Sequence, residues 1–409
     1  MKIIVIGGGP AGMMCALQAS QNAKNQVVLF EKNEKLGKKL YITGKGRCNV
    51  TNFVSPDEFL NNVVTNPKFL YSAINTFSSQ DTVEFLSNGG LKTIVERGNR
   101  VFPSSQKSSD VIKTFEKLLA RNNVKIMLNC AVKSINKNFN NKFVVKTNKE
   151  DFVCDSVVVA TGGVSYSSTG STGDGYNFCK AFGHNIISPK PSLVPIKLNN
   201  YEASLAGLTL KNVTASVVVN GKTFSKFGEM LFTHSGVSGP IVLSLSALVN
   251  TFDLRGAKFV IDFKPALTVE QLEDRLLREF EKNNTKSIKN YLKNLLPSSL
   301  IDVFIMRLGV DSSTRVCDIT KGVRQKIIHL LKNFSYDIIS LDDIEFAIVT
   351  SGGVDVKQIN PKNMMSKIVP NLFVVGEALD VDAFTGGFNI QIALSTGYLA
   401  GSYLKNMGE

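Results

Sequence analysis

A strand that runs into a glycine-rich turn near the N-terminus constrains the fold of this chain more than any other feature. The apolar segment 2–6 leads into Gly7-x-Gly9-x-x-Gly12, and residues 11–20 have the composition of a helix. In such a unit the first glycine makes the tight turn and the second lets the backbone approach a pyrophosphate. The third allows the helix to pack closely on the strand. The pattern predicts a dinucleotide at the positive N-terminal end of the helix.

A second strand makes this prediction specific, because three glycines alone can form an ordinary turn. Residues 26–30 are apolar and end at Glu31, where an acidic side chain binds ribose hydroxyl groups. An acidic rather than a basic residue at this position also argues against a 2′-phosphate on the nucleotide. The chain therefore opens with a βαβ unit that we expect to hold a dinucleotide.

Glycines interleaved with basic residues follow this unit. The two segments are Gly37-Lys38-Lys39 and Thr43-Gly44-Lys45-Gly46-Arg47-Cys48-Asn49. Backbone N–H groups and cationic side chains in this arrangement bind phosphates. A solvated basic loop is the ordinary interpretation of a charge run, but the interleaved glycines fit it poorly.

The rest of the chain changes its pattern twice. Alternating strands with an Asn220-Gly221 turn begin after about residue 190, and amphipathic helices run from 268 to about 333. On the first of these helices, one face carries Val269, Leu272, Leu276 and Phe280. Strands typical of a parallel sheet return after 342.

This organisation predicts an α/β fold in which a discontinuous Rossmann-like domain is interrupted by two insertions. The first insertion is an antiparallel, barrel-like β subdomain and the second is a small helical subdomain. The expected boundaries are 1–190 and 340–409 for the nucleotide domain, 191–266 for the β subdomain and 267–339 for the helical subdomain.

Composition excludes several classes of function. The chain has six cysteines without a Cys-x-x-Cys pair and three scattered histidines. We therefore expect no metal site, no redox-active dithiol and no iron–sulfur cluster. The N-terminus lacks the apolar stretch of a signal peptide, and the longest apolar run, 241–249, is too short to span a bilayer. These features favour a cytoplasmic protein with reduced thiols and no membrane insertion.

The net charge of +13, from 47 Lys and Arg against 34 Asp and Glu, invites comparison with nucleic-acid-binding proteins. The basic residues include 37 lysines, and no arginine-rich block with interleaved aromatic residues occurs. Lys38, Lys39, Lys45 and Arg47 lie in the segments expected to bind phosphates. The other basic residues are spread along the chain and are mostly lysines. We therefore do not expect a nucleic-acid partner, and no oligomeric state is predicted.

Together these motifs resemble the FAD-dependent flavoproteins of the BaiN-like and aminoacetone-oxidase-like family, within the glutathione-reductase-type Rossmann superfamily. The matching segments are 4–12, 37–39, 44–52, 160–163, 169–176, 231–240, 376–382 and 386–391. Because they occur in order along the whole chain, the resemblance implies FAD as the cofactor and an inserted β-barrel-like and helical part. Gln358 stands where a family glutamate is expected, and Ala383-Phe384 replace a Gly-Pro pair, so a family member's substrate is not carried over.

The resemblance also implies roles for the later motifs. The crossover at 160–163 returns beside the FAD phosphates, and Glu377 is placed to hold the ribityl hydroxyl groups, with Asp380 and Asp382 as competitors. The helix after Gly386-Gly387 would direct its positive end at the flavin ring and stabilise the charge of the reduced flavin. The residues expected to contact the cofactor are Gly7, Gly9, Pro10, Ala11, Gly12, Glu31, Lys32, Lys38, Lys39, Gly46, Arg47, Cys48, Asn49, Val132, Thr161, Gly162, Gly376, Glu377, Asp380, Gly387, Phe388, Asn389 and Ile390.

The catalytic acid or base is not assigned; besides the flavin itself, the candidates are His234, Arg47 and Tyr41. His234, in a Thr-His-Ser-Gly loop, is as consistent with a structural histidine as with a substrate-facing acid. Arg47 could lower the pKa of the adjacent Cys48, but without a nearby second cysteine we expect no redox role for this thiol. Tyr41 is of a residue type that more often packs than contacts substrate.

The expected function is flavin-mediated hydride transfer in which NAD(P)H reduces an unsaturated or carbonyl-conjugated small molecule. With no second Gly-x-Gly-x-x-Gly motif, the nicotinamide nucleotide would visit the flavin transiently. Three alternatives stay open. The chain could be an amine oxidase that acts on a small aminoketone and passes electrons to oxygen. It could be an RNA-modifying or RNA-binding flavoprotein, or a protein that only stores or senses FAD.

Overall fold

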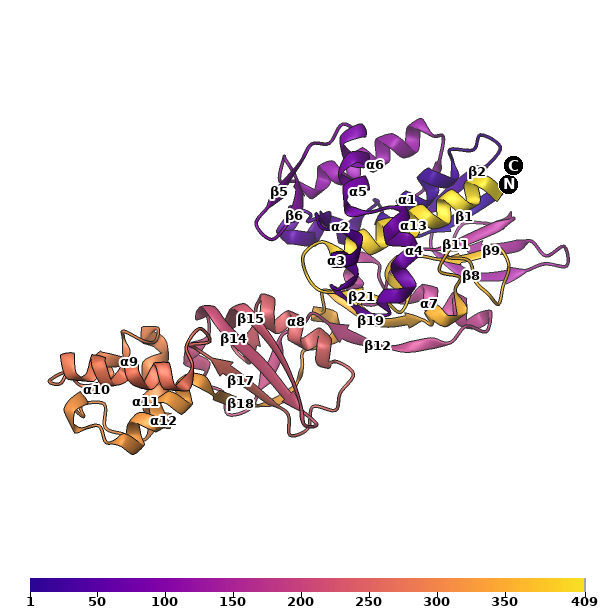
Figure 1. Cartoon of the computed structure of the whole chain (residues 1–409). Coiled ribbons are helices and arrows are strands. Elements are labelled where there is room, and N and C mark those ends of the chain that lie inside the picture. The colour runs from indigo at the N-terminus through magenta and orange to yellow at the C-terminus, as the bar shows by residue number, and fades with distance from the viewer. Residues whose placement is uncertain (408–409) are drawn as a thin grey trace. The chain divides into compact units, whose positions relative to one another are not determined.

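The structure is a computed structural model that describes residues 1–407, and it divides into two compact units (Figure 1). The first unit combines residues 1–192 with the chain from 343 onward, and the second consists of residues 193–342. Each unit has a hydrophobic core of its own. The expected fold class is confirmed, since a parallel α/β unit is interrupted by an insert that contains an antiparallel barrel.

A five-stranded parallel sheet in the order β20-β11-β1-β2-β7 forms the centre of the first unit. Its strands are β1 (Lys2–Ile6), β2 (Gln26–Phe30), β7 (Lys125–Met127), β11 (Ser156–Val159) and β20 (Leu372–Val374). Every residue of β11 and β20 is buried, as expected for parallel strands covered on both faces. Because β1 pairs with β2 on one side and β11 on the other, the glycine turn after β1 lies beside the carboxyl ends of both neighbours.

Two helices from opposite ends of the chain pack along each other at close range. They are α1 (Pro10–Ala19) and α13 (Phe388–Met407). A Cβ added to Gly397 would lie 2.3 Å from the Ala11 carbonyl oxygen, and one added to Gly401 would lie 2.6 Å from the Cys15 carbonyl oxygen. The two glycines therefore let the backbones touch, and this contact joins the C-terminal helix to the nucleotide-binding turn.

Small sheets and further helices complete the first unit. The helices are α2 (Lys38–Ile42), α3 (Pro56–Leu60), α4 (Tyr71–Thr76), α5 (Ser79–Asn88), α6 (Ser108–Arg121) and α7 (Asp174–Ala181). The strands are β3 (Thr51–Asn52), β4 (Val63–Thr65), β5 (Thr93–Glu96), β6 (Arg100–Pro103), β8 (Val132–Lys137), β9 (Phe143–Thr147), β10 (Asp151–Cys154), β12 (Ile186–Ser192), β19 (Val349–Val354) and β21 (Asp382–Ala383). They form the sheets β3-β6-β5, β10-β9-β8, β12-β19 and β21-β4.

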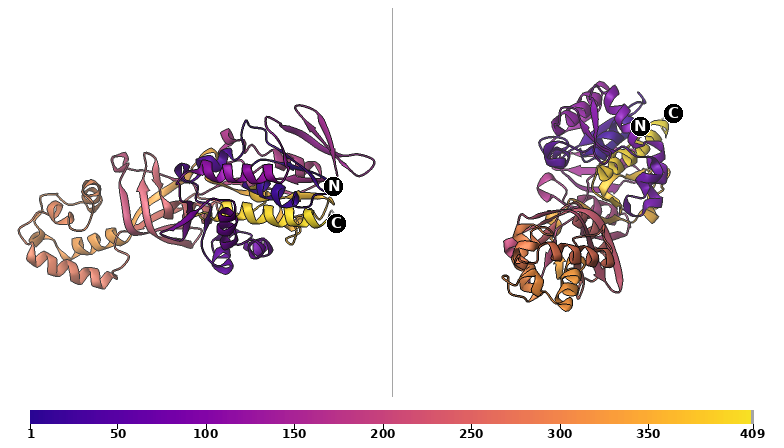
Figure 2. Two further views of the ribbon diagram at one scale, coloured as in Figure 1. Left: turned by 90° about the horizontal axis from the view of Figure 1, so that it is seen from above. Right: turned by 60° about the vertical axis from the view of Figure 1, so that its left-hand side comes forward.

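The second unit contains a closed antiparallel barrel in the order β13-β16-β15-β14-β17-β18. Its strands are β13 (Ile196–Leu198), β14 (Thr209–Val219), β15 (Lys222–Phe232), β16 (Gly236–Ser238), β17 (Lys258–Asp262) and β18 (Phe334–Leu341). Its helices are α8 (Pro240–Val249), α9 (Val269–Lys282), α10 (Ile288–Leu292), α11 (Ser298–Leu308) and α12 (Lys321–Lys332). Helix α8 packs on β15, whereas α9 to α12 gather at one end of the barrel and share its core (Figure 2).

One helical face expected from the sequence is only partly correct. Leu272, Leu276 and Phe280 of α9 are buried, but Val269 is 49% exposed. Val269 is the first residue of α9 and follows the N-cap Thr268, so it lies at the helix end that the core does not cover. Within residues 1–407, no helix combines the length and apolar character needed to cross a membrane.

Candidate functional site

The glycine turn between β1 and α1 leaves room for a ligand at one of its three glycines. Gly7 has φ +111°, and a Cβ there would lie 2.4 Å from the Ala160 carbonyl oxygen. A Cβ on Gly12 would lie 1.9 Å from the Gly7 carbonyl oxygen, so the protein's own packing requires both glycines. A Cβ on Gly9 would meet no heavy atom within 4 Å. The space beside Gly9 is therefore open to a group from outside the chain.

The N-terminal end of α1 is available to an anion. Gly9 is its N-cap residue, Pro10 follows in the first turn, and no side chain caps the backbone amides. The first turn contains no acidic residue, so the helix itself does not neutralise its positive end. Helix ends of this kind bind phosphates.

Glu31 lies at the end of β2, as expected, and is only 8% exposed. Its Oε2 accepts a hydrogen bond from the Gly8 N–H at 2.8 Å, and its Oε1 accepts two from Asn33 at 2.8 and 2.7 Å. These bonds fix the carboxylate against the glycine turn, while Oε2 keeps capacity for a further donor such as a ribose hydroxyl. The Cys130 N–H donates to the Glu31 carbonyl oxygen at 2.9 Å, so the chain leading to Val132 passes beside Glu31.

Two other predicted segments converge on the same turn. The segment after β11 touches Gly7 through Ala160, as described above, and a Cβ on Gly376 would lie 2.8 Å from Ala11 Cβ. Within this crossover Gly162 has φ +75°, and the buried Thr161 Oγ1 has no hydrogen-bond partner within residues 1–407. The fold thus gathers glycine-containing segments from the start, the middle and the end of the chain.

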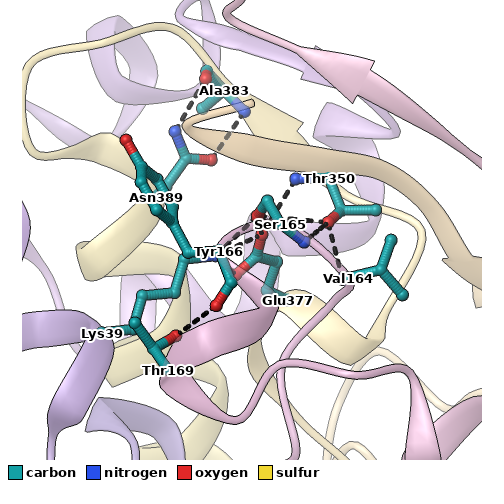
Figure 3. A network of polar contacts seen from close by, with 9 residues as sticks. All are labelled: Lys39, Val164, Ser165, Tyr166, Thr169, Thr350, Glu377, Ala383 and Asn389. Atoms are coloured by element: carbon teal, nitrogen blue, oxygen red, sulfur yellow. Dashed lines mark hydrogen bonds and ion pairs between the residues drawn. The ribbon is translucent and has the colours of Figure 1, made fainter. Parts of the chain in front are cut away.

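Lys39 and Glu377 form the centre of a polar network (Figure 3). Lys39 Nζ donates to Glu377 Oε2 and to Ser165 Oγ, both at 2.7 Å. The Thr350 N–H and the Ser165 hydroxyl donate to Glu377 Oε1 at 2.9 and 3.1 Å. The Lys39 and Glu377 side chains are 22% and 20% exposed, so the ion pair is partly shielded from water. Ser165, in a turn, and Thr350, in β19, carried no signal in the sequence, because the role of a single polar side chain is recognisable only from its partners.

This network bears on the carboxylate expected to hold the ribityl hydroxyl groups. All three carboxylates already have donors within the protein: Glu377 has the three just described, Asp380 accepts from Asn66 Nδ2 at 3.0 Å and from the Gly352 backbone, and Asp382 accepts from Ser192 Oγ at 2.7 Å and from Thr65 and Ser351. Burial raises the pKa of both aspartates above the ordinary range of a carboxyl group. The choice among the three carboxylates stays a prediction.

The segments expected to hold the flavin ring are in contact with each other. A Cβ on Gly387 would lie 2.5 Å from the carbonyl carbon of Thr51, and Asn52 Nδ2 donates to the Gly386 carbonyl oxygen at 3.1 Å. The β3 region therefore lies directly against the start of α13. In the same region, Asn49 Oδ1 and Thr51 Oγ1 are buried and have no hydrogen-bond partner within residues 1–407. An unpaired buried polar atom costs about 1–3 kcal/mol.

These features fit a dinucleotide cofactor. The open space at Gly9 recurs at Gly46, which has φ +82° and no heavy atom within 4 Å of an added Cβ. The amides at the start of α1 would hold phosphates, and the segments 46–52 and 386–390 would hold a ring system. We find within residues 1–407 no group of three His, Cys, Asp or Glu side chains that could hold a metal ion.

Several basic residues expected at the cofactor are paired within the protein. Lys32 Nζ lies 2.7 Å from the Asp174 carboxylate, and Lys38 Nζ lies 3.2 Å from the Glu34 carboxylate. Asp174 is the first residue of α7 and not its N-cap, which is Gly173. A contact of Lys32 or Lys38 with phosphate stays a prediction.

Arg47 does not lower the pKa of Cys48, a possibility that the sequence left open. The guanidinium hydrogen-bonds to Glu96 and Gln106 and lies 4.1 Å from the Phe102 ring centroid. Cys48 is fully buried, and this burial raises the pKa of its thiol to about 12. The pKa is raised and not lowered because loss of solvation outweighs any nearby positive charge.

The first residues of α13 brace the loop that precedes them. Asn389 Oδ1 accepts from the Ala383 N–H at 2.9 Å, and Asn389 Nδ2 donates to the Ala383 carbonyl oxygen at 2.8 Å. Phe388 packs against Phe59 with ring centroids 5.1 Å apart, and Ile390 packs on the core. These side chains hold the helix start in place, which leaves its backbone amides as the groups that could face a ligand.

The other catalytic candidates lie on exposed loops or short elements. Tyr41 is 46% exposed, and the Lys35 ammonium lies 4.9 Å from its ring centroid. His234 lies in the exposed loop between β15 and β16 of the second unit. Gln358, the departure from the family pattern, accepts a hydrogen bond from the Asn185 N–H at 2.8 Å. A catalytic role for Tyr41 or His234 stays a prediction.

Comparison with known proteins gives matches that cover nearly the whole chain. The family model described as "HI0933-like protein Rossmann domain" matches residues 1–403. A ribosomal RNA dihydrouridine synthase of Haemophilus influenzae is 30% identical over 402 residues, which cover 97% of this chain and 96% of the relative. A 3-dehydro-bile acid delta(4,6)-reductase of Clostridium scindens is 28% identical and covers 98% of both chains. The structure of 3-ketosteroid delta1-dehydrogenase from Sterolibacterium denitrificans shares the fold, with a TM-score of 0.53, 14% identity and 99% coverage of both chains.

Proposed function

This chain belongs to the HI0933-like family and is an FAD-dependent oxidoreductase, and we propose that it reduces a carbon–carbon double bond conjugated to a carbonyl group. The membership confirms the family resemblance noted in the sequence. It also agrees with the fit of a dinucleotide to the turn between β1 and α1.

The observation that carries the proposal is the chemistry shared by two relatives with different substrates. One is named for forming dihydrouridine in ribosomal RNA and the other for reducing the 4,6-double bonds of a 3-dehydro bile acid. In both substrates the reduced double bond is conjugated to a carbonyl group, so hydride adds at the far carbon while negative charge develops on the carbonyl oxygen. Both relatives align over nearly the entire chain, so this chain has counterparts of all their domains, which supports the same type of reaction here.

The residues of this chain would bind and orient the partners of such a reaction. Bound FAD would supply the hydride-transfer chemistry, which no side chain of the protein provides. The uncapped amides of α1 would hold its phosphates, and the start of α13 would favour negative charge on the ring. The Lys39 ammonium is held in a fixed position by Glu377 and Ser165. The paired Lys39 and Glu377 side chains would offer hydrogen-bonding groups, and no net charge, to this part of the site.

We propose NAD(P)H as the electron donor, and the test is an anaerobic half-reaction. NADH or NADPH should bleach the flavin absorbance of the purified holoenzyme. Addition of a 4,6-dien-3-one steroid or of a uridine-containing RNA should then restore it. If only amines bleach the flavin and peroxide forms on exposure to air, the protein is an amine oxidase and the proposal fails.

A uridine in ribosomal RNA is a second candidate for the substrate. The sequence left an RNA-modifying flavoprotein open as a weaker alternative because the net charge is +13, and a relative named for this activity is 30% identical. Mass spectrometry of ribosomal nucleosides tests this candidate. Dihydrouridine should disappear when the gene is deleted and return when it is restored. If its level does not change, the substrate is a small molecule.

A further inference from the structure

The positive charge of this chain is concentrated in one stretch of sequence. Residues 92–149 contain 13 Lys and Arg against three Asp and Glu, a net charge of +10 out of the total of +13. The remainder of the chain, with 34 basic and 31 acidic residues, is close to neutral. The stretch belongs entirely to the first unit, where it forms the β5–β6 hairpin, α6 and β7 to β9. This concentration is not what a uniform lysine-rich background would produce.

Helix α6 carries the most regular part of this charge. Lys113, Lys117 and Arg121 follow each other at intervals of four residues and are all exposed. Such residues lie on one side of a helix with a rise of about 6 Å between neighbours. None of the three forms an ion pair with any residue in 1–407, so the row is not neutralised within the protein. Like charges at this spacing destabilise an isolated helix. The row of Lys113, Lys117 and Arg121 therefore has a role other than stabilising α6.

The opposite side of α6 packs against the core of the first unit. Val111, Ile112, Phe115 and Leu119 are buried, with exposed fractions between 0 and 8%. The helix therefore has no free apolar face to insert into a membrane surface. What it presents outward is a polar surface with a line of positive charges.

The charge continues from α6 toward the segments of the candidate site. Lys107 precedes α6, and β6, which packs against α6, begins at Arg100. The Arg100 and Arg47 guanidinium groups lie 5.8 and 4.1 Å from the centroid of one ring, that of Phe102. Arg47, whose guanidinium is paired with Glu96, immediately follows Gly46, so the shared contact with Phe102 places Arg100 of this surface beside the segment that would hold the cofactor ring.

An exposed aromatic ring lies beside the start of α6. The Ser108 hydroxyl donates to the Tyr41 carbonyl oxygen at 2.7 Å, and the Tyr41 ring is 46% exposed. Positive charge that tracks a backbone, combined with an exposed aromatic ring on which a base can stack, is the arrangement that binds single-stranded nucleic acid.

We propose that the α6 face, formed by Arg97, Arg100, Lys107, Lys113, Lys117 and Arg121, is the surface on which an RNA substrate docks. The inference rests on the proposed function, because an RNA held there would present a uracil to the same reductase site. The regular row on α6 contacts successive phosphates, and the β5–β6 hairpin extends the contact toward the Gly46 segment. The face contributes affinity and not base specificity, since phosphate contacts carry no sequence information.

The experiment measures binding of the holoenzyme to a fluorescently labelled RNA stem–loop with a uridine-rich loop, by anisotropy over a series of salt concentrations. The test variant is K113Q/K117Q/R121Q, which removes the row and keeps good helix-forming residues. The matched control is K211Q/K321Q/K362Q. It removes the same charge from three lysines that are exposed and lie outside residues 92–149. Melting temperatures of both variants establish that they are folded.

The proposal predicts at least tenfold weaker RNA binding for the α6 variant and less than threefold weaker binding for the control. The slope of log affinity against log salt should become shallower by about two to three for the α6 variant, since each lost phosphate contact removes about 0.7–0.9. Equal losses in both variants, or salt-independent binding of the unaltered protein, would overturn it. So would binding to phosphatidylglycerol vesicles without binding to RNA, which would identify an anionic lipid surface as the partner.

A second readout separates failure of this surface from failure of the proposed function. Both variants should reduce a small conjugated ketone at the same rate as the unaltered enzyme, because a small substrate does not use the α6 face. The ketone can be a 4,6-dien-3-one steroid or any other that the unaltered enzyme accepts. If the unaltered protein binds RNA through α6 but transfers no electrons, the surface stands and the reductase proposal fails. If it reduces the ketone but the α6 variant binds RNA normally, the docking surface is wrong and the reductase proposal stands.

Discussion

Gly9 and Gly12 stand three residues apart in one turn, but they are glycine for different reasons. An added Cβ would collide with the Gly7 carbonyl oxygen at Gly12, whereas it would enter open space at Gly9. Gly9 also has φ −78°, a conformation open to any residue. The fold therefore requires glycine at position 12, whereas at position 9 it does not, and we propose that the cofactor does.

The matched substitutions Gly9→Ala and Gly12→Ala separate these two needs. G12A should lower the free energy of unfolding by about 2–3 kcal/mol, as overpacking of a tight contact does. G9A should unfold like the unaltered apoprotein but retain at least tenfold less FAD. Urea denaturation of the apoproteins and flavin content after purification measure the two effects. A G9A protein with normal FAD affinity would show that the ligand does not approach this turn.

The Lys39–Glu377 pair is a second test at the scale of single residues. Each variant alone, Lys39→Met or Glu377→Gln, leaves a partly shielded group without its charged partner. Each should lower the free energy of unfolding by about 1–3 kcal/mol. The double variant should lose less free energy of unfolding than the two single variants together, with a coupling energy of about 1–2 kcal/mol in the apoprotein. Purely additive costs would mean that the two charges do not stabilise each other.

At the scale of secondary-structure elements, the sequence predicted what is encoded locally. The β1–α1–β2 unit and the alternating strand before the Asn220-Gly221 turn both occur as expected. Their signals are apolar periodicity, glycine and proline at fixed positions, and turn residues. Val269 belongs to the expected apolar face of α9 but is exposed, because periodicity shows which residues share a face and not how far the core extends along it.

The packing of α13 on α1 depends on backbone contact and not on side-chain area. Gly397→Ala places a methyl group 2.3 Å from the Ala11 carbonyl oxygen, so the helices must separate, and we expect a loss of about 2–3 kcal/mol. Gly322→Ala in α12 is the control, since an added Cβ there meets nothing nearer than 4.0 Å. This substitution should stabilise the protein by about 0.5–1 kcal/mol. Thermal melts of both variants measure the difference, and equal effects would mean that the close contact is not required.

At the scale of the whole molecule, the site is assembled from segments that no local pattern connects. The sequence identified the segments around Gly9, Thr161, Gly376 and Gly387, and the fold brings the first three together and places the fourth against β3. It did not predict that Lys39 binds Glu377, because the two are 338 residues apart and either could have bound a phosphate or a hydroxyl group. Individual contacts of this kind follow from tertiary structure alone.

We propose that the insert behaves as an independent folding unit. Its expected β part, 191–266, is completed by β18 (Phe334–Leu341), so the last barrel strand begins inside the expected helical part, 267–339. The helices α9 to α12 share one apolar core with the barrel, and this core is separate from that of the first unit. A chain of residues 193–342 expressed alone should therefore unfold in one cooperative transition and bind no flavin. Circular dichroism during thermal unfolding tests this, and a chain without a transition would contradict it.

The most direct test of the account is the flavin content of the purified, unaltered protein, measured by absorbance and by mass spectrometry of the cofactor released on denaturation. The account predicts one FAD per chain, with the absorption spectrum of an oxidised flavin. A protein that contains no flavin and takes up none from an excess of FAD would contradict it.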